Sequence, residues 1–115
     1  MNGADRIAAE RMRQIEEERW TPAHDEEHVH GELASAAVCY AMPQVLRKQA
    51  VRYGIADVSG GRGECAVYGN ERYLVPPEWP AAWHPSWWKP TDRITNLVKA
   101  GALIAAEIDR LLASA

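Results

Sequence analysis

The chain has 115 residues, enough for one domain with a single core and too few for a two-domain enzyme. Its 47% of hydrophobic and 25% of charged residues are typical of a globular protein, and its formal net charge of −3 argues against binding to duplex nucleic acid. Two cysteines, no signal-peptide pattern and no apolar stretch longer than 100–106 indicate a soluble cytoplasmic protein that does not bind membranes.

The first predicted element is a helix over residues 4–18, whose apolar side chains recur at helical spacing on one face. These side chains are Ile7, Ala8, Met12 and Ile15. Trp20 ends this segment. Thr21 and Pro22 then favour the cap and first turn of a second helical segment.

The second helical segment is interrupted at Gly31 and continues beyond it as a helical stripe, which Pro43 ends. The positions of this stripe are Leu33, Ala36, Ala37, Tyr40 and Ala41. A short third helix is predicted over residues 45–53, where apolar residues again share one face, and Gly54 ends it.

The middle of the chain has weaker patterns. Residues 55–64 contain three glycines and are predicted to form a loop. Residues 65–68 and 72–75 flank Gly69-Asn70, a pair suited to the turn of a short β-hairpin. We interpret residues 43–78 as an insertion in a helical scaffold.

The last predicted helix is the most regular element, and Thr91 is expected to cap it. Its continuous apolar face is formed by Ile94, Leu97, Val98, Gly101, Ile104, Ala105, Ile108, Leu111 and Leu112. Gly101 lowers helix propensity by about 1 kcal/mol relative to Ala, so close packing against another helix is the better explanation for it. Because an isolated helix is marginal in water, this face is expected to pack on the other helices.

These segments together predict a mainly α fold in a single domain covering residues 1–115. It consists of three or four packed helices, a small β-hairpin or irregular insertion at about 43–78, and a loop rich in Trp and Pro.

Metal-dependent catalysis has little support in the spacing of the ligand-type residues. His24 and His28 are spaced as two zinc ligands on one helical face, but an Asp follows the first His and the flanks are polar, unlike a zinc-protease helix. A Mg²⁺-dependent nucleotide pyrophosphohydrolase of the MazG kind would use acids three or four residues apart, and no two of the sixteen Asp and Glu residues have that spacing. The acids that could still converge from different helices are Glu10, Glu17, Glu32 and Glu107. We predict no metal site and no cofactor.

Residues 79–93 contain four of the five tryptophans and lead into the last helix. The tryptophans of this segment are Trp79, Trp83, Trp87 and Trp88. Lys89 and Arg93 follow them, and Lys99 lies further along the same helix. The rings either cover the core, in place of the Phe residues that this chain lacks, or line a pocket in which they stack on a base while the cations bind phosphate.

Five short motifs resemble a group of small proteins encoded by tailed phages and prophages. They lie at residues 20–25 (WTPAHD), 31–33 (GEL), 36–41 (AAVCYA), 87–90 (WWKP) and 99–104 (KAGALI). The resemblance covers residues 1–42 and 79–112 and leaves 43–78 unmatched. It implies a phage accessory protein that acts in the bacterial cytoplasm, and it carries over no catalytic residues.

Our leading hypothesis is a homo-oligomeric protein that binds and sequesters a small anionic, nucleotide-like ligand without turning it over. A signal made by a host defence system would be such a ligand, because phage accessory proteins often act against host defence. The residues predicted to stack on the base are Trp87, Trp88 and Trp20. Those predicted to neutralise phosphate are Lys89, Arg93 and Lys99, and those predicted to hydrogen-bond the sugar or base are His24 and Asp25.

Two alternatives remain open from the sequence. In a MazG-like pyrophosphohydrolase Glu107 would act as a pocket acid; otherwise Glu107 is expected to pair with an arginine of the first helix, Arg11 or Arg13. A protein that inhibits a host factor through its tryptophan surface is the third interpretation.

Overall fold

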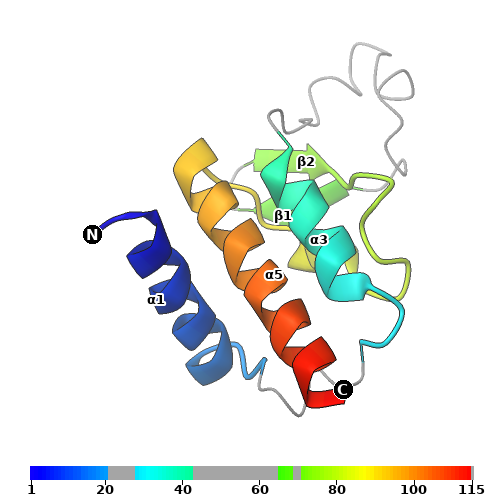
Figure 1. Ribbon diagram of the computed structural model, residues 1–115. Coiled ribbons are helices and arrows are strands. Elements are labelled where there is room, and N and C mark those ends of the chain that lie inside the picture. Colours follow the sequence, from blue (N-terminus) through cyan, green and yellow to red (C-terminus); the bar gives the residue numbers. More distant parts are fainter. Residues whose placement is uncertain (21–27, 43–64, 69–70, 115) are drawn as a thin grey trace.

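The computed structural model describes residues 1–20, 28–42, 65–68 and 71–114. Three α-helices make up most of these described residues: α1 (Gly3–Glu16), α3 (Glu32–Ala41) and α5 (Arg93–Ser114). In Figure 1, α5 runs between α1 and α3, and both of them contact it. The predicted mainly helical fold is confirmed. The segment expected to start a helix at Thr21 and the third helix expected over 45–53 lie outside the described residues.

A pair of short strands lies beside the helices. β1 (Cys65–Tyr68) and β2 (Glu71–Leu74) are antiparallel, with the first residue of β1 opposite the last residue of β2. β1 contacts η2, a single 3-10 turn over Pro85–Trp87 within the tryptophan segment. Among the described residues, no helix combines the length and apolar character needed to span a bilayer.

A capping box fixes the start of α1. Asn2 Oδ1 accepts a hydrogen bond from the backbone N–H of Asp5 at 2.9 Å, and Asp5 Oδ2 accepts one from the backbone N–H of Asn2 at 3.2 Å. At the other end the chain turns back, so that the N–H of Trp20 donates to the carbonyl of Gln14 at 2.9 Å. The helix predicted over 4–18 is therefore confirmed to within two residues at each end.

The inward face of α1 differs from the predicted apolar face. Ile7 and Ile15 are half-buried, but Met12 is 51% exposed, whereas Arg11 and Gln14 are buried. Arg11 can be buried because its Nη1 donates to the carbonyl of Trp20 at 3.2 Å. The apolar periodicity thus located the helix, but polar contacts rotate it relative to the expected orientation.

The predicted stripe of α3 is confirmed. Gly31 precedes the helix with φ of 80°, a left-handed conformation that favours glycine over other residues. The side chains that α3 buries are Leu33, Ala36, Ala37, Cys39 and Tyr40. Three of these side chains, Ala36, Ala37 and Cys39, are small and allow a close approach of α3 to α5.

The packing of α5 corrects two expectations. Its first turn is capped by Asp92 rather than Thr91, since Asp92 accepts hydrogen bonds from the backbone N–H and the hydroxyl of Thr95 at 3.0 and 2.6 Å. The buried face is also not the predicted apolar face. The buried residues of α5 are Asn96, Ala100, Ala102, Leu103 and Ala106, whereas six of the predicted Ile and Leu residues are exposed.

The expected close approach at Gly101 is confirmed. A Cβ at this position would lie 2.5 Å from Cδ1 and 2.7 Å from Cγ1 of Ile7, so α1 packs directly on the backbone of α5 there. This contact joins the first and last helices of the described fold.

Candidate functional site

The tryptophan rings of residues 79–93 are divided between the core and the surface. Trp79, Trp83 and Trp88 are buried in the core, where their ring centroids lie 5.5 Å apart in the pairs Trp79–Trp83 and Trp79–Trp88. Tyr40 of α3 completes this cluster, with its ring centroid 4.7 Å from that of Trp88. Trp87, by contrast, is 47% exposed. Three rings therefore form core and one remains available at the surface.

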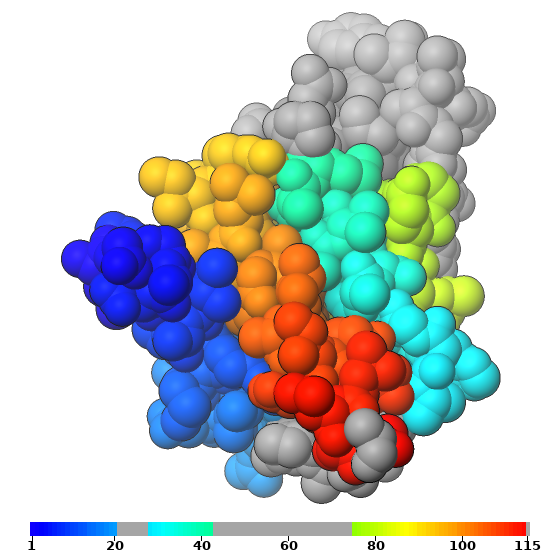
Figure 2. Space-filling view, in the orientation of Figure 1, coloured from blue at the N-terminus to red at the C-terminus, as the bar shows by residue number. Residues whose placement is uncertain are grey.

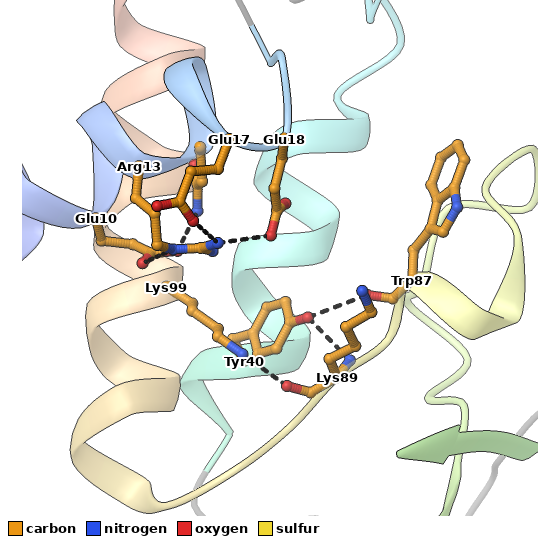
Figure 3. Close-up of polar contacts among 9 residues, drawn as sticks. Glu10, Arg13, Glu17, Glu18, Tyr40, Trp87, Lys89 and Lys99 are labelled. Atoms are coloured by element: carbon orange, nitrogen blue, oxygen red, sulfur yellow. Dashed lines mark hydrogen bonds and ion pairs between the residues drawn. The ribbon is translucent and has the colours of Figure 1, made fainter. Parts of the chain in front are cut away.

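A pocket of about 240 Å³ opens beside this cluster, between α1, α3, α5 and the tryptophan segment. Four of the eight predicted site residues line it: Trp20, Trp87, Lys89 and Lys99. The remaining lining residues are Glu10, Arg13, Gln14, Glu18, Tyr40 and Leu103. The structure thus brings together side chains from four separate parts of the chain (Figure 3).

Tyr40 holds the backbone that forms one wall of the pocket. Its hydroxyl donates to the carbonyl of Trp87 at 3.3 Å and accepts from the backbone N–H of Lys89 at 3.1 Å (Figure 3). Burial raises the pKa of Tyr40 above its usual value, so the hydroxyl stays protonated and keeps its donor. The exposed ring of Trp87 and the side chain of Lys89 are positioned from this anchored backbone.

The basic end of the pocket contains two lysines. Nζ of Lys99 donates to the carbonyl of Lys89 at 2.8 Å and lies 5.5 Å from the centroid of the Tyr40 ring. Burial lowers the pKa of Lys99, because the charged ammonium loses solvation. Within the described part of the chain, neither lysine forms an ion pair with a carboxylate, so both ammonium groups remain available to an anion.

The acidic end of the pocket is organised around Arg13. Glu10 accepts two hydrogen bonds from the Arg13 guanidinium at 2.7 Å each, and Glu18 pairs with the same group at 2.9 Å. Burial alone would raise the pKa of Glu10, but the hydrogen bonds and charge of Arg13, with a hydrogen bond from Gln14, hold it below its usual range. The hydrogen bond to Glu10 in turn raises the pKa of Arg13. Arg13 is therefore already neutralised, and the pocket has one acidic and one basic end.

Two of the other predicted site residues, Trp88 and Arg93, lie outside the pocket lining. Trp88 belongs to the core, and Nη1 of Arg93 donates to the carbonyls of Ala41 and Met42 at 2.8 and 2.7 Å, which caps the end of α3. His24 and Asp25 lie outside the described residues. Sequence reasoning did not assign Tyr40 or the acidic end to the site, because both meet the tryptophan segment only through tertiary contacts.

The four acids considered as a metal-binding set are not gathered in one place: Glu10 and Glu17 both pair with Arg13, whereas Glu32 and Glu107 have other partners. Glu107 pairs with Arg110 of its own helix, which corrects the expected pairing with Arg11 or Arg13. Glu32 accepts from the backbone N–H of His30, and Glu10 is bound to Arg13. The described residues contain no group of three or more His, Cys, Asp and Glu side chains able to hold a metal ion.

No family model, curated protein or solved structure matches this chain. A function must therefore be inferred from the chemistry of the pocket.

Proposed function

We propose that this pocket binds a small anionic, nucleotide-like ligand and holds it without chemical turnover. One observation carries the proposal: the same pocket is lined by two lysines and by two tryptophans. Among the described residues, neither lysine has a carboxylate partner. An anion bound at Lys89 and Lys99 would replace solvation that Lys99 loses on burial.

The two ends of the pocket suit two parts of one ligand. A phosphate would lie at the lysine end, where each ammonium group can donate charge-assisted hydrogen bonds. A base would stack on Trp87 or Trp20, an interaction worth about 1–3 kcal/mol per base. Its amino groups could donate to Glu10 and Glu18, whose carboxylates lie at the opposite end.

The pocket volume limits how much of the ligand is enclosed. A volume of about 240 Å³ lies below the roughly 300–1,000 Å³ of sites for drug-sized molecules. Because a mononucleotide is itself a molecule of that size, the pocket would enclose only part of one nucleotide unit, and the rest of the ligand would lie outside the pocket. Contacts from His24 and Asp25 remain part of the proposal, although both residues lie outside the described part of the chain.

Sequestration of a signal made by a bacterial defence system is the biological role we propose, in line with the resemblance to phage accessory proteins. Binding without catalysis is favoured over Mg²⁺-dependent hydrolysis by one specific observation. The two acids of the pocket, Glu10 and Glu18, are both bound to Arg13 and would have to leave it to hold a metal ion.

The experiment is a calorimetric binding titration with a panel of mono- and cyclic nucleotides, together with native mass spectrometry of protein purified from bacteria. Lys99→Met and Trp87→Ala should each weaken binding about tenfold or more, which corresponds to about 1.4 kcal/mol. Arg6→Met is the matched control, because Arg6 is an exposed cation of α1 that does not line this pocket. If the folded protein binds no nucleotide of the panel, or if Arg6→Met weakens binding as much as Lys99→Met, the proposal is refuted.

A further inference from the structure

The helix α5 has an unusual distribution of side chains. Its outward face is apolar: six Ile and Leu side chains are between 42% and 68% exposed. They are Ile94, Leu97, Ile104, Ile108, Leu111 and Leu112. The inward face buries small or apolar residues together with the polar Asn96, and Glu107 and Arg110 pair with each other while partly buried. A helix whose outward face met only solvent would have polar side chains on that face.

This apolar face is open on the described molecule. The space-filling view in Figure 2 shows α5 as an uncovered surface between α1 and α3. α1 packs beside this face at Gly101, where Ile7 contacts the backbone, and it lines a shallow groove together with Ile94. Ile104, Ile108 and Leu111 lie beyond that contact, toward the end of the helix.

The spacing of the exposed residues is that of a helix–helix seam. Along α5 the positions Ile94, Leu97, Gly101, Ile104, Ile108 and Leu111 are separated alternately by three and four residues. This alternation is the a and d pattern of a heptad repeat. Gly101 is the position of the pattern that Ile7 of α1 already covers, and the exposed Ile and Leu side chains on either side of it remain to face a partner helix.

The size of the face is that of a subunit contact. Half-exposed Ile and Leu side chains at six positions present on the order of 600 Å² of apolar surface, the upper end for a monomer that has no partner. A standard interface buries about 800 Å² on each partner. The outward face of α5 therefore supplies most of the area that one subunit of such an interface buries.

We propose that this face binds a second copy of the same chain, with α5 of each subunit packed against α5 of the other about a two-fold axis. A seam of this kind is complementary to itself, so one patch serves both subunits. The ligand pocket stays open in such a dimer. Lys99, which lines the pocket, is nine residues from Ile108, and at about 100° per residue the two side chains point to opposite sides of the helix.

Sedimentation equilibrium at micromolar concentration tests the proposal. The wild-type chain should sediment at twice its mass of 12.8 kDa, and Ile108→Lys should sediment as a monomer with an unchanged circular dichroism spectrum. Val29→Lys is the matched control, because Val29 is 57% exposed, against 51% for Ile108, and lies before α3. It should leave the dimer intact.

Two results overturn the proposal: a monomeric wild-type chain, and a folded Ile108→Lys variant that remains dimeric. If Ile108→Lys fails to fold, the milder Ile108→Ala decides the question. It should raise the dimer dissociation constant about tenfold or more, since each dimer loses two contacts, and an unchanged constant would refute the seam.

Discussion

The hydroxyl of Tyr40 offers a quantitative test of how the tryptophan segment is held. Tyr40→Phe removes one oxygen and keeps the ring that packs on Trp88 and Trp79. The lost interactions are the hydrogen bonds to the carbonyl of Trp87 and from the backbone N–H of Lys89. At about 0.5–1.5 kcal/mol net for each hydrogen bond, we expect a loss of about 2 kcal/mol in the free energy of unfolding. For a chain of this length that lowers Tm by about 6–12 °C.

Thermal and urea unfolding followed by circular dichroism would measure this loss. Ser114→Ala is the control, since it removes an exposed hydroxyl that donates to the carbonyl of Arg110, and it should change stability by less than about 0.5 kcal/mol. A Tyr40→Phe variant as stable as Ser114→Ala would show that the hydroxyl does not anchor the segment. Trp87 and Lys89 would then owe their positions to the packing of the neighbouring rings instead.

Two further predictions concern α1. Gly101→Ala should lower the free energy of unfolding, measured by chemical denaturation, by about 1 kcal/mol, because overpacking against Ile7 outweighs the gain in helix propensity. In an Ile7→Ala background the same change should instead stabilise the protein. A loss of equal size in both backgrounds would refute the contact. The pKa of Glu10 is held below its usual 4.5, so its contribution to stability is complete above that pH and is lost as the pH falls through the lower folded value. The Glu10→Gln variant should therefore be less stable at neutral pH, and its free energy of unfolding should decline less as the pH falls below 4.5. A decline as steep as that of the wild-type protein would contradict the role of the pair with Arg13.

Local patterns were sufficient to predict the three α-helices of the described residues. The stripe from Leu33 to Tyr40 follows from periodicity, and the interruption predicted at Gly31 follows from the backbone freedom of glycine. Both signals are properties of a few neighbouring residues. The prediction of the first helix succeeded for the same reason, even though it missed the capping box of Asn2 and Asp5.

Tertiary contacts decided the features that the sequence did not predict. The periodicity of α5 identified an apolar face correctly, but it could not say whether that face would meet α1 and α3 or remain outside. Residues 79–93 have no regular period, so nothing local separates the buried Trp88 from the exposed Trp87. The acidic end of the pocket depends on α1 lying beside the tryptophan segment, which no short motif specifies.

The central position of α5 has a consequence for how the chain acquires its structure. Both α1 and α3 pack on α5, which comes last among the described elements in the order of synthesis. As the chain leaves the ribosome, Leu33 and Tyr40 emerge long before the surface that covers them, and closing such distant contacts is slow because of the chain entropy involved. The nascent chain must therefore keep its early helices unpaired until α5 is made, and this interval is the stage at which it is most exposed to aggregation and to chaperones.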